Sequence, residues 1–288
     1  MQNITHRLNF EDQQARIALL TKTALEGYAA LWEQMVAQWQ AAKSDAVWLT
    51  YSANYLFHTA GVRWALDPLS LFSRLSMPNP MNFAEDLAPL DAVVLTHRHA
   101  DHLDLELLSE LVDLPMTWIV PEFLMEELHT IFESRTPKVI VPQPGVPIQI
   151  KDLVLKPFEG LHFRDGNSVP EIGYLAEFSG KRWAFPGDTR LFPPHNLTKL
   201  GRLDGIFAHL WLGKKCALHE KPPLLEEFCR FFTEPSPRQL VITHMHELAR
   251  KPDDFWDASH FSQVYAKCGE LNPEILVTPA WTGSSVPL

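Results

Sequence analysis

A strand of the buried type leads directly into a cluster of metal-ligand side chains, and this junction constrains the fold more than any other feature. Residues 91–96 read Asp-Ala-Val-Val-Leu-Thr, and four ligand-type residues follow within six positions: His97, His99, Asp101 and His102. His97 and His99 are two residues apart at a strand end, so they point to the same side. The next two fall where the chain turns into a predicted helix, so their side chains diverge. Imidazoles and a carboxylate suit zinc, and the segment can present two ligands to each of two metals.

The bulk composition is that of a globular protein with an acidic exterior. Of the 288 residues, 46% are hydrophobic and 21% charged, which excludes general disorder. The 25 Lys and Arg against 35 Asp and Glu give a formal net charge of −10. Such a surface repels a polyanion over most of its area, so we expect no extended nucleic-acid surface.

Cysteine usage and the chain's N-terminus indicate a cytoplasmic location. Cys216, Cys229 and Cys268 form no C-x-x-C pair, and an odd, sparse set fits a reducing compartment. The first residues lack the basic-then-apolar pattern of a secretory signal. No apolar run approaches the roughly 20 residues that span a bilayer, so we expect no transmembrane segment.

The pattern along the chain predicts an N-terminal helical extension over residues 1–45 and an α/β body over residues 46–288. Residues 11–43 contain no proline, and only Gly27 interrupts good helix formers. Apolar residues recur at three- and four-residue steps, which predicts one long amphipathic helix, or two that break near Gly27. Its role is open among an extra layer packed on the body, a contact for a homo-oligomer, and a cap over a substrate cleft.

The body alternates short strands with helices. Predicted strands cover residues 47–51, 55–58, 62–66, 91–96, 118–120, 139–141, 153–157, 172–178, 182–185, 205–209, 240–243 and 275–278, and a helix covers 103–111. Residues 69–90 show no periodicity and predict a long surface loop. Residues 69–83 and 211–216 follow strands that feed the same sheet edge. They either wall a substrate cleft or pack on the domain's own helices.

The H-x-H-x-D-H segment at residues 97–102 resembles the metal-binding motif of the metallo-β-lactamase superfamily, and other motifs of that family follow in order. Glu-Gly-Leu-His ends at His162 after a predicted strand, and Pro-Gly-Asp-Thr places Asp188 after another. His244 directly follows strand 240–243. Upstream, Asp67 matches an acidic residue that in the family supports a ligand histidine from behind. The resemblance covers the chain from about residue 47 to 279.

This resemblance implies a fold and a ligand set. The fold is α/β, a four-layer αββα sandwich of the metallo-β-lactamase type, here with an N-terminal helical extension. Carried over to this chain, His97, His99 and His162 hold the first metal, Asp101, His102 and His244 hold the second, and Asp188 bridges them. The cofactors are then two divalent metal ions, with zinc favoured and manganese or iron as alternatives. Asp101 and Asp188 take part in catalysis as well as in metal binding.

The predicted function is a dinuclear metal-dependent hydrolase that uses a metal-bound hydroxide on a small phosphodiester or related ester. Two zincs, two carboxylates and a hydroxide leave the centre at about +1, so a small anionic substrate is compatible with an acidic chain. The Leu103-Asp104 continuation resembles the branch that contains the ascorbate-phosphate lactonase and the N-acyl-phosphatidylethanolamine phospholipase D. Members of that branch act on phosphodiesters or lactones.

Several alternatives stay open. A lactonase or a thioesterase would use the same scaffold. An iron-dependent oxidoreductase is less favoured, because the family's diiron form usually has a glutamate at the second ligand position and this chain keeps His99. A non-catalytic metal-binding protein is a further alternative. His246, His209 and His219 are candidate proton donors to a leaving group, and His246 also competes with His244 for the last ligand position.

Overall fold

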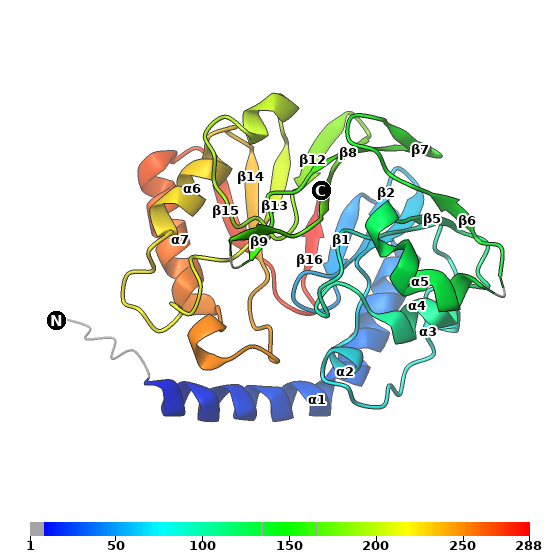
Figure 1. Ribbon diagram of the computed structural model, residues 1–288, viewed down its shortest axis with the longest axis horizontal. Coiled ribbons are helices and arrows are strands. Elements are labelled where there is room, and N and C mark those ends of the chain that lie inside the picture. The colour runs from blue at the N-terminus through cyan, green and yellow to red at the C-terminus, as the bar shows by residue number, and fades with distance from the viewer. Residues whose placement is uncertain (1–8, 134, 165) are drawn as a thin grey trace.

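Two seven-stranded sheets lie face to face, with helices on both outer faces (Figure 1). The computed structural model describes residues 9–133, 135–164 and 166–288, so the first eight residues of the predicted extension lie outside the described residues. The predicted four-layer αββα sandwich of the metallo-β-lactamase type is confirmed.

The strand order places parallel strands in one half of each sheet, from the middle to one edge. The first sheet runs in the order β16 (Ser285–Pro287), β1 (Ala46–Leu49), β2 (Tyr55–Thr59), β3 (Val62–Leu66), β4 (Ala92–Val94), β5 (Thr117–Ile119), β6 (Lys138–Ile140). The second runs in the order β15 (Leu276–Pro279), β14 (Gln239–Thr243), β13 (Gly205–His209), β12 (Lys181–Phe185), β11 (Ile172–Phe178), β8 (Leu153–Glu159), β7 (Ile148–Ile150). A small hairpin of β9 (Phe163–Arg164) and β10 (Asn167–Ser168) stands apart from both. Strands β3 to β6 are parallel, and so are β12 to β15.

An aromatic core joins the two sheets. Phe57 and Trp64, from neighbouring strands of the first sheet, stack with ring centroids 3.8 Å apart. Phe185 of the second sheet meets both rings edge-on, at 5.2 and 6.0 Å. Stacked and edge-to-face rings bury large apolar areas with defined geometry, so this core fixes the spacing of the sheets and of the loops at their edges.

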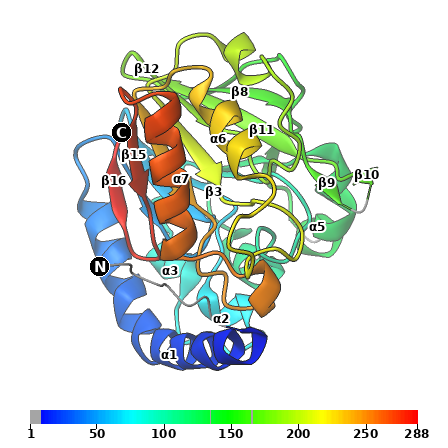
Figure 2. The same cartoon turned by 90° about the vertical axis from the view of Figure 1, so that its left-hand side faces the viewer.

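Six helices cover the outer faces of the sheets. On the first sheet lie α2 (Leu71–Arg74), α3 (Phe83–Asp86), α4 (Leu105–Leu111) and α5 (Met125–Phe132), and on the second α6 (Leu225–Thr233) and α7 (Ala258–Leu271). Figure 2 shows α6 and α7 in front of the second sheet. Among the described residues, none of the helices has the length and apolar character that crossing a membrane requires.

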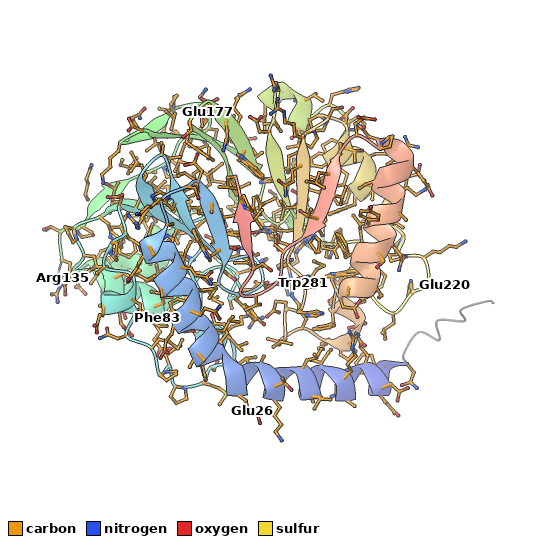
Figure 3. All side chains as sticks on the ribbon, turned by 180° about the vertical axis from the view of Figure 1, so that it is seen from behind. Glu26, Phe83, Arg135, Glu177, Glu220 and Trp281 are labelled. Carbon is orange, nitrogen blue, oxygen red and sulfur yellow. The ribbon has the colours of Figure 1, made fainter. Side chains whose placement is uncertain are left out.

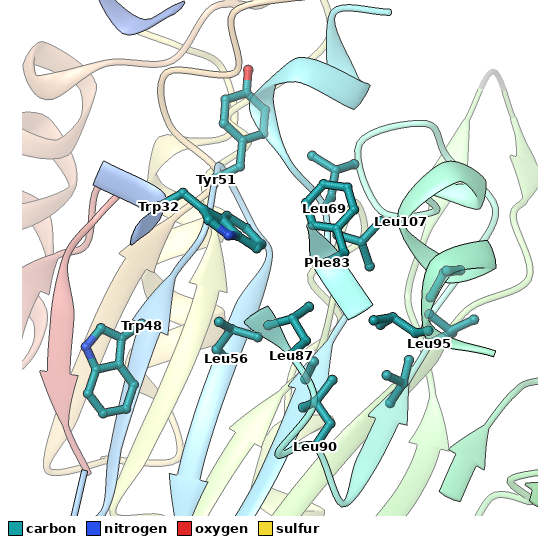
Figure 4. Close-up of a cluster of buried hydrophobic side chains, with 14 of the residues drawn as sticks. Trp32, Trp48, Tyr51, Leu56, Leu69, Phe83, Leu87, Leu90, Leu95 and Leu107 are labelled. Carbon is teal, nitrogen blue, oxygen red and sulfur yellow. The ribbon is translucent and has the colours of Figure 1, made fainter. Parts of the chain in front are cut away.

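The extension is one continuous helix, α1 (Phe10–Ala41), and it changes direction near Glu26 (Figure 3). The bend coincides with Gly27, the weak helix former that the sequence singled out. After the bend, Tyr28, Trp32 and Trp39 are buried in the core cluster that packs on the first sheet, and Figure 4 shows Trp32 there. Truncating a fully buried tryptophan such as Trp32 costs about 3–5 kcal/mol, so this half is an integral layer of the fold.

The first half of α1 crosses to the other side of the molecule. It runs beside η3 (Pro252–Asp254). Arg16 donates to Asp257, the N-cap of α7, at 2.5 Å. The helix therefore bridges the helical layers of both sheets below their edge (Figure 1).

The prediction of a long surface loop over residues 69–90 is wrong. Two one-turn helices, α2 and α3, interrupt it, capped by the side chains of Ser70 and Asn82. Leu71 and Phe83 are buried, and Phe83 packs edge-on against Trp32 of α1. Helices of four residues are too short to show a period, which is why the sequence pattern missed them. Strands β7, β9, β10 and β16 were also missed, because each has only two or three residues.

Candidate metal centre

Strand ends from both sheets meet at one edge of the sandwich. Strands β3 and β4 are parallel neighbours, as are β12, β13 and β14, and the carboxyl ends of parallel strands lie at the same edge. The side chains at or just after these ends are Asp67, His97, Asp188, His209 and His244. The motifs predicted from the sequence therefore converge, although they are spread over 178 positions between residues 67 and 244.

Two of these residues lie on strained backbone. Asp67 and His244 have φ angles of 46° and 62°, in the left-handed region that residues with a side chain rarely adopt. Hydrogen bonds hold both turns, from the Asp67 N–H to the Val94 carbonyl at 2.9 Å and from the His244 N–H to the Ser52 carbonyl at 2.8 Å. Strain of this kind persists where the surroundings impose it, and it clusters at functional sites.

The first donor cluster contains His97, His99, His162 and Asp188, with one potential ligand atom of each within 4.8 Å of the others. Nε2 of His97 lies 3.2 Å from Nδ1 of His99, so these two rings aim at a common point. Three of the four residues are buried, and His99 is partly exposed. These are the residues that the sequence assigned to a first metal and to the bridge.

The second donor cluster contains Asp101, His102 and His244, and Asp188 of the first cluster also groups with His102 and His209. Nε2 of His244 is 3.2 Å from Oδ2 of Asp101, and Nε2 of His102 is 3.4 Å from Oδ1 of Asp188. All seven residues predicted from the sequence as ligands therefore lie in two adjoining groups.

The spacing within each cluster fits a shared cation. Two donors that bind one zinc ion at about 2.0–2.1 Å with tetrahedral geometry lie about 3.3 Å from each other. The donor pairs described above are separated by 3.2, 3.2 and 3.4 Å. In addition, His102 Nε2, His162 Nδ1 and His244 Nδ1 are buried without a hydrogen-bond partner among the described residues. Unsatisfied buried polar atoms are costly, and a divalent cation satisfies the lone pair of an unprotonated imidazole nitrogen.

Buried carboxylates hold the ligand histidines from behind. Asp67 contacts Nδ1 of His102 through Oδ2 at 2.8 Å and accepts from the Thr96 N–H at 2.8 Å, so it lies where the sequence placed it. Because a carboxylate only accepts, Nδ1 of His102 carries a proton. Burial lowers the pKa of His102, but its hydrogen bonds to Asp188 and Asp67 raise it well above the ordinary value, so a cation at Nε2 would displace a proton.

Glu171 does the same for the first cluster, and the sequence reasoning missed it. Its Oε1 lies 3.1 Å from Nδ1 of His97 and accepts from the Asp188 N–H at 2.8 Å. Burial alone would raise the pKa of Glu171, but His97 and His162 lower it far more, so the carboxylate is ionised. The only local signal was an acidic residue placed directly before the apolar strand β11.

Two glycines make room for Glu171. A Cβ added at Gly187, in the Gly-Asp turn, would lie 2.5 Å from its carboxylate, and one at Gly160 would lie 2.7 Å away. Gly187 also has a φ of 74°, which favours glycine. The Gly-Asp signature is thus explained by the buried glutamate behind it as well as by the turn.

The titration of His99, His244 and Asp101 favours metal binding. Burial lowers the pKa of His99 to about 3 and that of His244 to about 4, so both rings are neutral near pH 7. Burial raises the pKa of Asp101, but hydrogen bonding to His244 and the charges of His102 and Arg250 hold it well below its ordinary range. Neutral imidazoles and ionised carboxylates are the forms that coordinate metals.

Comparison with protein families decides the affiliation of the chain. A family model described as a beta-lactamase superfamily domain matches residues 65–245, more than half of the sequence. The chain belongs to the metallo-β-lactamase superfamily. A search of curated proteins found no match to the sequence.

Solved structures share the superfamily fold with this chain at low sequence identity. Igni18, a metallo hydrolase from the archaeon Ignicoccus hospitalis, is 18% identical with a TM-score of 0.62, over 85% of this chain and 99% of that one. YhfI, a metallo-β-lactamase fold protein from Bacillus subtilis, is 14% identical with a TM-score of 0.64, over 85% and 100%. CmlA, a diiron β-hydroxylase from Streptomyces venezuelae, is 15% identical with a TM-score of 0.61, over 86% of this chain and 55% of that one.

The three candidate proton donors take different places in this superfamily fold. His209 is buried in the centre, with Nδ1 3.0 Å from Oδ1 of Asp188 and Nε2 3.0 Å from the Tyr55 hydroxyl. His246 lies outside both donor clusters and packs between Phe255 and Trp281, so it does not displace His244 from the cluster. His219 is exposed and belongs to neither cluster. Of the three, His209 alone touches a member of the centre.

Two arginines, which the sequence reasoning did not single out, also reach the centre. Arg190 donates to Oδ2 of Asp188 at 2.5 Å, and Arg250 donates to Oδ2 of Asp101 at 2.6 Å. Arg250 also lines a groove of about 590 Å³ between the first half of α1 and the loop around Leu248. The helical extension is therefore a packed layer in its second half, and its first half lines the groove that Arg250 also lines.

Proposed function

We propose that this chain is a dinuclear metal-dependent hydrolase. The observation that carries the proposal is the convergence of seven donors in two clusters that share Asp188. His97, His99 and His162 would hold one divalent cation, and Asp101, His102 and His244 the other. When bound, such a pair of cations polarises the electrophilic group of a substrate and lowers the pKa of a water molecule.

The chain's own residues orient the donors and exclude solvent. Asp67 and Glu171 hold Nδ1 of His102 and His97, so that Nε2 of each ring faces the cluster. His209 bonds to Asp188 on one side and to Tyr55 on the other, which fixes the carboxylate. The cluster residues other than His99 are buried, so the reacting groups meet a mostly dry surface of low dielectric.

A small phosphodiester or related ester is the substrate that we propose, with a lactone or thioester as the alternative. Two divalent cations outweigh the two ligand carboxylates, so the centre attracts an anion even though the chain has a net charge of −10. The resemblance of Leu103-Asp104 to the lactonase and phospholipase D branch supports the same choice. The three cysteines are buried and form no disulfide among the described residues, which supports a cytoplasmic location.

The second candidate function is an iron-dependent oxygenase, favoured by the similarity of fold to the diiron hydroxylase CmlA. Elemental analysis of protein purified without added metal separates the two candidates. About two zinc or manganese ions per chain support the hydrolase, and iron with oxygen-dependent turnover supports the oxygenase.

A substrate screen then tests the reaction. Metal-replete protein is assayed on phosphodiester, lactone, thioester and β-lactam model substrates, with metal-stripped protein as the control. Metal-dependent hydrolysis of a phosphodiester is the expected result. Inactivity on all four classes by protein that holds both metals contradicts the proposed function and favours a non-catalytic metal-binding protein.

A further inference from the structure

Arg190 follows the Gly-Asp-Thr turn directly, which places it beside the metal centre, where a substrate-binding residue would lie. Its side chain is more than nine-tenths buried, and its guanidinium carbon lies 4.9 Å from the ring centroid of Trp211. Nη2 donates to Asp188 at 2.5 Å. Nη1 is buried and has no hydrogen-bond partner among the residues that the structure describes. A buried guanidinium with an unused donor is costly, so it indicates a ligand that completes its bonding.

Arg250 approaches the other cluster from the groove. Its Nη2 lies 2.6 Å from Oδ2 of Asp101 and 3.4 Å from Nε2 of His244, while its Nε pairs with Glu247 at 3.3 Å. The exposed fraction of the Arg250 side chain is 25%. Lys22 and Lys251 line the same groove, so its positive charge continues outward from the centre.

Both arginines are paired with carboxylates that the proposed function gives to metals. A carboxylate oxygen that coordinates a cation is a weaker acceptor, and the cation repels a guanidinium beside it. Each arginine then keeps its charge and its planar fork of donors, but its hydrogen bond to the carboxylate is weakened. Guanidinium forks of this kind bind phosphate and carboxylate groups through two parallel hydrogen bonds.

We propose that Arg190 and Arg250 bind an oxyanionic group of the substrate, a phosphate or a carboxylate, on the two sides of the metal centre. This inference rests on the proposed function and narrows its substrate class to anions. Trp211 supports the plane of the Arg190 guanidinium, and the groove beside α1 admits the rest of the substrate past Arg250. The competing explanation is that both arginines only position the ligands Asp188 and Asp101.

Anion titrations of the protein with its bound metal test the proposal. Inorganic phosphate and acetate are titrated by calorimetry into wild type, Arg190→Met and Arg250→Met, and the metal content of each sample is measured. Arg230→Met is the matched control, because Arg230 is exposed and pairs with Glu226 on α6, away from the centre. We expect wild type and the control to bind alike. Each test variant should bind about tenfold more weakly, without losing metal.

The outcomes separate the possibilities. A larger loss for phosphate than for acetate identifies a phosphate group as the ligand, and the reverse identifies a carboxylate. Equal affinity in wild type and both variants, or no binding by wild type, overturns the proposal. Weaker binding accompanied by loss of metal also overturns it, because the arginines are then positioning residues. The proposed function fails separately, through the substrate screen, and arginine-dependent anion binding would stand even then.

Discussion

The two donor clusters share Asp188 but are built from different materials. The first joins three histidines to that carboxylate and is backed by the buried Glu171. The second adds a carboxylate of its own, Asp101, and places a guanidinium against it. Arg190 contacts the shared Asp188 and so bears on both clusters, whereas Arg250 contacts a ligand of the second cluster alone. This contrast predicts that the first cluster binds its metal more tightly than the second.

Removing the shared ligand should abolish the difference in metal affinity between the two clusters. The variant Asp188→Ala takes a donor from both clusters, so we expect metal affinity at both sites to fall by more than about 100-fold and hydrolysis to be lost. Elemental analysis after dialysis and circular dichroism check the metal content and the fold. Asp152→Ala, on an exposed turn, is the control. A variant that keeps two metals and full activity would remove Asp188 from the centre.

Changing the supporting carboxylates should affect the clusters one at a time. Glu171→Gln removes the charge behind His97, and Asp67→Asn removes the one behind His102. Each should weaken its own site by about 10–100-fold and leave the other site nearly unchanged. Competition titrations against a chromophoric chelator give the two affinities, and each variant is the control for the other. Equal losses at both sites in either variant would contradict the division into two clusters.

Arg250→Met should reduce the difference in metal affinity between the two sites by strengthening the second site. Without the guanidinium beside Asp101, the second site loses a repulsive charge, so we expect its metal affinity to rise about tenfold. The same chelator competition measures the change, with Arg230→Met as the matched control. An unchanged or lowered affinity would show that Arg250 does not oppose the second metal.

The smallest effect is expected at His209. This histidine hydrogen-bonds to Asp188 and to Tyr55 without belonging to the predicted ligand set. The variant His209→Gln keeps a hydrogen-bonding side chain, so both metal affinities should stay within about fivefold of wild type. Loss of one metal in this variant would instead make His209 a ligand of the second site.

The sequence predicts the donors far better than their supports. Strands β4, β12 and β14 could be recognised because apolar runs end in His97, Asp188 and His244, and ligand chemistry is visible locally. Glu171 could not be recognised, because its role depends on strand β11 lying next to β8 and on room left by two glycines. The same holds for Arg190 and Arg250, whose partners are fixed only by tertiary packing.

The extension illustrates a similar limit. Its helical character follows from periodicity, and Gly27 marked a possible break; the structure shows one continuous helix that bends there. The second half of the helix is buried, while the first half borders a groove that the loop around Leu248 also lines. No local sequence pattern predicts this difference between the two halves. Self-association through this helix and the division of the chain at residue 45 stay predictions.

Anomalous X-ray scattering from a crystal of the purified protein is the direct test of whether the two donor clusters each hold a metal ion. Data collected at the absorption edge of the metal found by elemental analysis locate each ion without reference to any assumed ligand. We expect two anomalous peaks, one on each side of Asp188. One should lie among His97, His99 and His162, and the other among Asp101, His102 and His244. A single peak in metal-replete crystals, or peaks away from these side chains, would contradict it.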